Sequence, residues 1–340
     1  MRVLPLFAAG LLPMLAGACA TTPAITGLPP VPVTATGETA PVGTNNADAA
    51  DDPAIWRNAA NPAASLIVAT DKKAGLYVYG LDGAIRSFTD SGRVNNVDLV
   101  DMGQQGIIVI ASDRNDVTAA KAQLFRLDPA TATLTQLAIL PVGAGEAYGM
   151  CATGRDGTLL IYSPVKEGAI YEQRITLGAT LTAENLRTLK VATQPEGCVV
   201  DHRDGTLYVG EEDAGIWRFR SGAGTGEMVA AVDNRYLVAD VEGLGLVPED
   251  ANGGWLVASS QGDNAYALFR LPDMAPTGRF AVVPGTIGGS EETDGLEVIA
   301  GDFGPAYPEG LFIAQDGHNQ PAAQNFKLVS WAAIRAALGL

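Results

Sequence analysis

Short apolar runs, each bounded by polar or acidic residues, recur along the chain from about residue 50 to about residue 330. Each repeat opens on a polar motif, enters an apolar run, turns, and continues into a second and often a third apolar run. The six opening motifs are ADDPAIW, NNVDLV, EAYGMC, QPEGCVV, DVEGLGLV and ETDGLEVI. Runs of this length between turn residues are typical of β-strands, and helical periodicity is nearly absent before Trp331–Leu338. The pattern therefore predicts an all-β protein.

The repeats keep a nearly constant length. One anchor residue in each opening motif marks them at spacings of 46 to 52 residues, and these anchors are Asp52, Asp98, Tyr148, Glu196, Glu242 and Asp294. Six copies of a unit of three to four short strands predict a six-bladed β-propeller, since a sandwich would not show six copies of one hairpin pattern. Equivalent positions of the blades converge around the axis of a propeller, so we expect the anchors to form one ring.

A second ring is expected from the residues that end the second strand of each repeat, which are Lys72, Arg114, Lys166, Glu212, Gln261 and Asp316. The two rings divide by charge along the chain. The first three repeats supply basic and hydrogen-bonding groups, on Lys72, Arg114, Tyr148 and Lys166. The last three repeats supply oxygen ligands, on Glu196, Glu212, Asp240, Glu242, Gln261 and Asp294. We therefore expect a mouth that is cationic on one side and acidic on the other.

The N-terminal segment has the features of an export signal, because Arg2 precedes an apolar run from Val3 to Leu15 that small residues follow. The expected organisation is a signal peptide, a linker with one entering strand, and a single propeller domain, at residues 1–19, 20–47 and 48–340. The sequence LAGAC is close to a lipoprotein box, which leaves lipidation of Cys19 and plain secretion both open. The expected location is periplasmic or extracellular, with an outer-membrane lipoprotein as the lipidated form.

The composition limits the classes of partner and chemistry. Of 340 residues, 47% are hydrophobic, and 38 acidic residues against 22 basic ones give a net charge of −16. This charge disfavours nucleic acid and anionic membranes as partners, and it fits an exported protein or one that collects cations. With only His202 and His318, a Ser-His-Asp or zinc–histidine mechanism has little material. Cys151 and Cys198 fit either a disulfide or two buried thiols.

The acidic side of the expected mouth suits a hard cation. Ca²⁺ takes six to eight oxygen ligands and tolerates irregular geometry, and a single ion cannot use all of these charges. We therefore expect several calcium ions, held by Asp52, Glu196, Glu212, Asp240, Glu242, Gln261 and Asp294. The alternative is an acidic rim that is only solvated.

The basic side suits a multiply charged anion. Arg114 offers a planar fork to phosphate oxygens, Lys72 and Lys166 offer mobile charges, and Tyr148 can donate a hydrogen bond. Ordinary salt bridges to the neighbouring acids are the alternative for the three basic residues. Together with bound metal, these groups predict phosphoryl transfer to water, because metal lowers the pKa of the attacking water and stabilises charge on the phosphate oxygens.

Several motifs resemble those of the β-propeller phytases, one set per repeat and in order from about Asp51 to Trp331. They are DDPAIW, TDKKAGLYVY, NNVD, SDRN, YGM, KEG, QPEG, EEDAGIWRF, DVEGL, ASSQGDNAY, TDGLEV, GLFIAQDG and QNFKLVSW. The resemblance implies a six-bladed propeller that hydrolyses phytate (myo-inositol hexakisphosphate) with calcium, preferring the calcium–phytate complex. It implies phosphate binding by Lys72, Arg114, Tyr148 and Lys166. It also implies a catalytic calcium shell of Glu196, Glu212, Asp240, Glu242 and Gln261, to which Asp52 and Asp294 contribute.

Some positions depart from the family pattern. Asp71 stands where the family often has asparagine, and Gly288 and Gly289 stand where relatives often carry an acid. The extra acid at Asp71 predicts slightly weaker phosphate binding. The two glycines, with a short loop after Gly317, predict the loss of a peripheral calcium site. The expected catalytic set is complete, and consists of Lys72, Arg114, Tyr148, Lys166, Glu196 and Glu212.

Two other functions stay open at this point. One is a calcium-dependent lactonase or organophosphate hydrolase on a similar scaffold, although such sites usually recruit His or Asn and do not need three basic residues along one side. The other is a non-catalytic surface propeller that binds calcium or phosphate. We expect a monomer with a small-molecule substrate and without a nucleic-acid partner.

Overall fold

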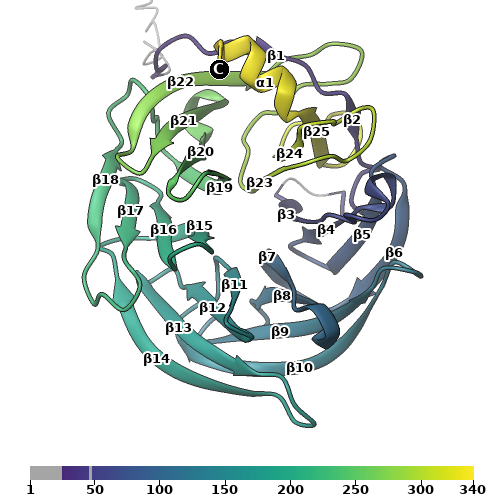
Figure 1. Ribbon diagram of the computed structural model, residues 1–340, viewed down its shortest axis with the longest axis vertical. Helices are drawn as coiled ribbons and strands as arrows, with labels where there is room; N and C mark the ends of the chain where they lie inside the picture. Colours follow the sequence, from purple (N-terminus) through teal and green to yellow (C-terminus); the bar gives the residue numbers. More distant parts are fainter. Residues whose placement is uncertain (1–24, 46–47) are drawn as a thin grey trace, which may run out of the picture.

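Six small sheets surround a central axis, so the molecule is a six-bladed β-propeller, as predicted (Figure 1). The computed structural model of the chain describes residues 25–45 and 48–340, and the predicted signal peptide and Cys19 lie outside the described residues. The first strand of each blade lies nearest the axis and the later strands follow outwards. Among the described residues, no helix has the length and apolarity needed to cross a membrane.

The strand bounds follow the predicted repeats. Blade one consists of β3 (Ala50–Trp56), β4 (Leu66–Asp71), β5 (Gly75–Gly80) and β6 (Ile85–Asp90). Blade two consists of β7 (Val94–Asp101), β8 (Ile107–Asp113), β9 (Ala119–Asp128) and β10 (Thr133–Ala144). Blade three consists of β11 (Cys151–Arg155), β12 (Thr158–Pro164), β13 (Ala169–Thr176) and β14 (Thr182–Lys190). The fourth and fifth blades consist of β15 (Pro195–Asp201), β16 (Thr206–Glu211), β17 (Gly215–Phe219) and β18 (Glu227–Ala231); and β19 (Val241–Glu249), β20 (Gly253–Ser260), β21 (Ala265–Leu271) and β22 (Ala275–Val282). The sixth contains β23 (Leu296–Ala300), β24 (Gly310–Asp316) and β25 (Asn325–Ser330). Short 3₁₀ turns are η1 (Pro62–Ala64), η2 (Gly103–Gln105) and η3 (Gln261–Asp263).

Two short strands before residue 48 complete the last two blades. β2 (Gly37–Glu38) pairs with β25 as the outer strand of blade six, and β1 (Val31–Val33) pairs in parallel with β22 of blade five. An ion pair holds this closure, because the buried Lys327 ammonium lies 2.6 Å from an oxygen of the exposed Glu38 carboxylate. The N-terminal segment predicted as a linker with one entering strand therefore contributes two strands to the propeller sheets.

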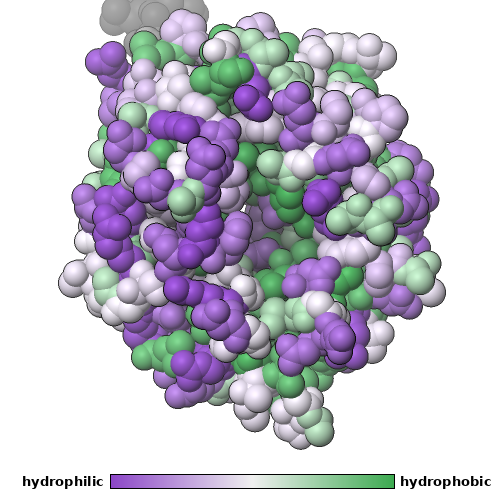
Figure 2. Space-filling view, viewed as in Figure 1, coloured by the Kyte–Doolittle hydropathy of each residue, from purple (hydrophilic) through white to green (hydrophobic). Residues whose placement is uncertain are grey.

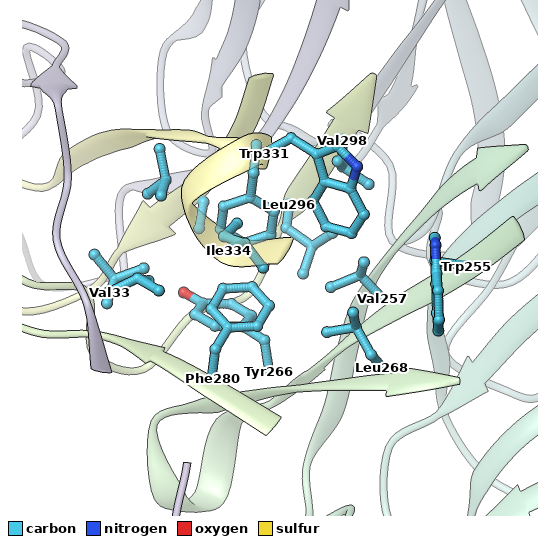
Figure 3. Packing of buried hydrophobic residues seen from close by; sticks show 14 of the residues in the cluster. Val33, Trp255, Val257, Tyr266, Leu268, Phe280, Leu296, Val298, Trp331 and Ile334 are labelled. Atoms are coloured by element: carbon cyan, nitrogen blue, oxygen red, sulfur yellow. The ribbon is translucent and has the colours of Figure 1, made fainter. Parts of the chain in front are cut away.

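The inner strands are buried on both faces, because each sheet packs between two neighbours. β4, β5 and β8 are buried along their whole length and read LIVATD, GLYVYG and IIVIASD. Near-continuous apolar runs are what a strand with two buried faces requires. Between blades five and six, the rings of Tyr266, Phe280 and Phe312 lie 4.9–5.2 Å apart. Figure 3 shows Tyr266 and Phe280 within this cluster. The helix α1 (Trp331–Leu338) covers this cluster with Trp331 and Ile334.

A disulfide between Cys151 and Cys198 joins the innermost strands of blades three and four, with the two Cα atoms 5.7 Å apart. This bond answers the question that the sequence left open about the two cysteines. A disulfide is consistent with export, since such bonds persist in oxidising compartments. It also links the blade of Tyr148 to the blade of Glu196 close to the mouth.

Candidate active site

The pairing of the first two strands decides which residue of each blade occupies the ring. In blade four, Pro195 and Cys198 both pair with the second strand, and Glu196 lies in the irregularity between them. Blades one, two and five have the same irregularity after the first paired residue of their first strand. In blades three and six, the pairing between the first two strands identifies the residue that occupies the equivalent position. The equivalent residues are Asp51, Asn95, Tyr148, Glu196, Glu242 and Asp294.

Two predicted anchors therefore lie off this ring, and for them the prediction was wrong. Asp52 follows Asp51 by one residue, and its carboxylate accepts a backbone hydrogen bond from β7 at 3.0 Å. Asp98 lies three residues beyond Asn95 and accepts one from β11 at 2.7 Å. Both carboxyls line the central channel, and burial raises the pKa of Asp98 to about 7. Asp51 takes the ring position expected of Asp52.

Glycine follows the ring residue in blades three to six because the neighbouring blade lies against it. A Cβ on Gly197 would lie 2.1 Å from the carbonyl oxygen of Glu242, and a Cβ on Gly295 would lie 2.5 Å from that of Asp51. No side chain fits at these distances, so glycine lets adjacent blades bring their ring residues together. The recurring acid–glycine pairs of the sequence are explained by this approach.

The second ring is fixed by a repeated backbone hydrogen bond. In five blades a residue at the end of the second strand donates its N–H to a carbonyl just before the ring residue, at 2.7–3.2 Å; these residues are Lys72, Arg114, Lys166, Glu212 and Gln261. The pairing register puts Gly317 at the equivalent place in blade six. The predicted Asp316 lies one residue earlier, 3.2 Å from the buried ammonium of Lys327, so the prediction was wrong for this blade.

Three glutamates come together on the acidic side of the mouth. Ligand oxygens of Glu196, Glu212 and Glu242 lie within 4.8 Å of one another. Burial and neighbouring carboxylates raise the pKa of Glu196 and Glu242 well above the usual range, and burial raises that of Glu212 to about 7. One oxygen of Glu242 has no hydrogen-bond partner among the described residues. Buried carboxylates this close repel one another unless a proton or cation lies between them, so the donor set fits a hard metal ion.

Asp240, Gln261 and Asp294 flank these glutamates. Val241, which follows Asp240, donates its backbone N–H to the Glu212 carbonyl at 2.9 Å, and the charge of Asp240 contributes to raising the pKa of Glu212. The Gln261 amide donates to Asp294 Oδ1 at 2.6 Å. Burial raises the pKa of Asp294 to about 6, although the Lys72 ammonium opposes this rise. All three therefore present oxygen atoms on the acidic side that the sequence predicted.

Lys72 lies among carboxylates rather than free in the mouth. Its ammonium is 2.7 Å from Asp294 Oδ2 and 2.9 Å from Asp51 Oδ2, and it also contacts Asp48. Burial alone would lower the pKa of Lys72, but these acids and Glu196 raise it well above its usual value. Lys72 is therefore a fully protonated cation in this structure.

Arg114, Tyr148 and Lys166 form one group on the opposite side. The Lys166 ammonium lies 4.3 Å from the centre of the Tyr148 ring, and the Arg114 guanidinium carbon lies 4.9 Å from it. Two Arg114 nitrogens donate to Glu146 Oε1 at 2.9 and 2.5 Å. Burial raises the pKa of the Tyr148 phenol far above neutrality, so its hydroxyl stays a hydrogen-bond donor. Three of the four predicted phosphate-binding groups therefore lie together, whereas Lys72 lies among the carboxylates.

The structure adds three residues that the sequence reasoning missed: Asp51, Asn95 and Glu146. The Asn95 amide donates to Glu196 Oε1 at 2.6 Å, and its carbonyl accepts from Arg114, so Asn95 joins the acidic and basic sides. Asp51 and Asn95 would have been found by aligning the repeats on the strand bulge. Glu146 opens the third motif, but it carried no signal beside the aromatic anchor two residues later.

A channel of about 590 Å³ runs along the axis below the mouth, lined by the innermost strands of the blades. Figure 2 shows the molecule hollowed near its centre, with hydrophilic residues around much of the opening. Glu297 lines the channel with Asp52 and Asp98, and its carboxylate accepts the backbone N–H of Ile55. Burial raises the pKa of Glu297 well above the usual range.

Comparison with known proteins places this geometry in context. The family model described as Phytase matches residues 2–340. The 3-phytase of Bacillus subtilis (strain 168) is 35% identical over 327 residues, which cover 90% of this chain and 85% of that protein. A chain in the crystal structure of the mitotic checkpoint complex superimposes with a TM-score of 0.53 at 14% identity, over 96% of this chain and 86% of its own. At that identity, the second likeness concerns the fold alone.

Proposed function

This chain belongs to the phytase family, and from that premise we propose that the ring of strand-borne acids and bases is the site at which phytate loses phosphate to water. The protein is a phytase, a hydrolase of the phosphomonoesters of myo-inositol hexakisphosphate. One observation carries the assignment of the site. Asn95 bonds both Arg114 and Glu196, so a cation-binding cage and a phosphate-binding group open on one mouth.

The cage is proposed to hold calcium, and more than one ion. The donors are all oxygens, the three glutamates are too close to remain charged alone, and an oxygen of Glu242 lacks a partner among the described residues. The proposed ligands are Glu196, Glu212, Asp240, Glu242, Gln261 and Asp294, with Asp51 at the place first assigned to Asp52. When bound, the metal would lower the pKa of the attacking water and stabilise charge on the phosphate oxygens.

The protein groups are proposed to bind and orient the substrate. Arg114 offers its remaining N–H groups to phosphate oxygens, Lys166 offers a half-exposed ammonium, and Tyr148 donates its hydroxyl. Lys72 supplies a further charge from the acidic side. Glu196 and Glu212 accept hydrogen bonds from the water that attacks phosphorus. The calcium–phytate complex suits this mouth, because its cations meet the carboxylates and its phosphates meet the bases.

The disulfide between Cys151 and Cys198 supports an exported location. We propose an exported monomer, periplasmic or extracellular, in which Cys19 is the site of lipid attachment if an anchor exists. Globomycin treatment of cells that produce the chain would block processing of a lipidated form, and unaffected processing would exclude the anchor.

Phosphate release from phytate by metal-stripped protein, with and without added calcium, tests the function. We expect activity only with calcium, and loss of activity in Lys72→Ala and Glu212→Gln. Glu227→Gln changes an exposed acid on the outer strand β18 and serves as a matched control. Phytate binding without turnover would support the non-catalytic alternative, and turnover of a lactone panel in place of phytate would support the other hydrolase.

A further inference from the structure

The Lys72 ammonium occupies the place of a cation. Its three carboxylate neighbours come from two blades and from the segment before β3, and two of them, Asp294 and Asp51, lie within 2.9 Å. The Lys72 side chain is 6% exposed, whereas that of Lys166 is 31% exposed. A substrate phosphate therefore reaches Lys166 directly, but it reaches Lys72 only after the carboxylates release it.

Asp51 shows that this place requires a cation. The residue is fully buried, and neither of its carboxylate oxygens makes a directed hydrogen bond among the described residues. A buried carboxylate without hydrogen bonds is costly unless a positive charge compensates it. Here the compensating charge is Lys72, 2.9 Å from Oδ2. Removing that ammonium leaves Asp51 and Asp294 in need of another cation.

We propose that Lys72 and a divalent cation compete for the carboxylates of Asp51 and Asp294, so that cation binding releases Lys72 toward the phosphate groups of the substrate. The inference rests on the proposed function, since it assigns an order of events within the same mouth. Coupling is reciprocal: if Lys72 weakens cation binding by some factor, a bound cation weakens the hold on Lys72 by the same factor. The flexible four-carbon stem of lysine allows the ammonium to move while the backbone stays in place.

Calcium titration by calorimetry on metal-stripped protein tests the competition. Lys72→Met should bind calcium at least tenfold more tightly at one or more sites, because the competing ammonium is gone. Lys73→Met removes the same charge one residue away, from a side chain that is 38% exposed. Of the carboxylates that the structure describes, this side chain contacts only Asp48, at 3.2 Å. We expect a change of less than threefold in this control. Calcium affinity in Lys72→Met that equals or falls below that of the wild type overturns the proposal.

Amine labelling of the wild-type protein gives a second readout that does not depend on how a variant folds. With an acylating reagent and peptide mass spectrometry, the labelling rate of Lys72 should rise at least fivefold on saturation with calcium. Lys327 is the matched control, because its ammonium is fully buried against Glu38 and Asp316 and its rate should stay constant. An unchanged rate at Lys72 overturns the proposal.

Neither readout involves phytate turnover, so the two hypotheses fail separately. A protein that hydrolyses phytate with calcium but shows neither effect at Lys72 keeps the proposed function and loses the competition. A protein that shows both effects but does not release phosphate keeps the competition and loses the proposed function.

Discussion

Replacing Asn95 tests whether the acidic and basic sides of the mouth act as one site. Its amide donates to Glu196 Oε1 at 2.6 Å, its carbonyl accepts from Arg114, and the residue is fully buried. Asn95→Leu keeps the branched shape of the side chain and removes both bonds, together with the bond that the Asn95 amide donates to Asn96 Oδ1 at 2.8 Å. The variant therefore separates the cation cage from the arginine without altering any group proposed to contact substrate.

The expected magnitude follows mainly from the two lost bonds to Glu196 and Arg114. A hydrogen bond to a charged group contributes about 1.5–3 kcal/mol net, and Arg114 keeps its two bonds to Glu146. Most of the loss therefore falls on Glu196, and we expect the metal-free variant to lose about 2–4 kcal/mol of unfolding free energy. Because Arg114 loses a partner that orients it, we also expect kcat/KM for phytate to fall about tenfold to a hundredfold, which corresponds to about 1.4–2.7 kcal/mol.

The assay pairs initial rates of phosphate release at fixed calcium with urea unfolding of the metal-free protein. Asn185→Leu is the matched control, since Asn185 is exposed on β14 and its carbonyl accepts from Gln173 at 2.6 Å. The control should leave kcat/KM unchanged. If Asn95→Leu also stays within threefold of the wild-type kcat/KM, the two sides work independently and the argument for a single site is wrong.

Three further outcomes are expected. Reduction of the Cys151–Cys198 bond, whose partners are 47 residues apart, should cost about 4 kcal/mol of unfolding free energy by the loop-entropy relation, measured in urea; a double Cys→Ala variant should not respond to reductant. Gly197→Ala should lower stability by about 1–3 kcal/mol and reduce phytate hydrolysis, because its Cβ meets a backbone carbonyl, whereas Gly224→Ala, with open space around it, should be neutral in both assays. Metal-free protein should lose stability as pH rises from 4.5 to about 7, because folded Glu212 keeps a proton that the unfolded chain releases. Unfolding curves over a pH series should show a smaller change of unfolding free energy with pH in Glu212→Gln, and an equal change would contradict the prediction.

The sequence predicted the blades because the determinant is local. An inner strand buried on both faces must be apolar along its length, and turn residues must follow it, so six repeats could be counted directly. The positions of Lys72, Arg114 and Lys166 were also accessible, because each lies where an apolar run ends and one backbone hydrogen bond fixes that end. β1 and β2 have only three and two residues, too few for a periodic pattern to mark both.

The residues of the ring could not be predicted from the sequence in the same way. A bulge shifts which residue points into the ring, but it leaves the pattern of apolar and polar residues unchanged. Asp51 and Asp52 are adjacent acids, and only the pairing of Ala50 and Pro53 with β4 shows which one lies in the irregularity. In blade two, the conspicuous acid Asp98 lies on the channel, and the ring position belongs to the neutral Asn95. The partners of the bases were hidden for another reason: Asp48 and Glu146 precede their ring residues, where the sequence shows only loop-like acids.

The charges of the mouth interleave more than the order along the chain suggested. Lys72 of blade one lies against Asp294 of blade six, and Arg114 lies against Glu146 of blade three. A phosphate must therefore displace or share a carboxylate in order to reach either base. The affinity of the mouth for phosphate therefore depends on what else Asp294 and Glu146 can bind. A cation that binds these carboxylates strengthens phosphate binding even where it does not contact the phosphate. On this argument, the proposed calcium requirement includes an exchange of partners within the mouth, in addition to the proposed effect of the metal on the attacking water. A chain with a net charge of −16 can hold a polyanion where that exchange is complete.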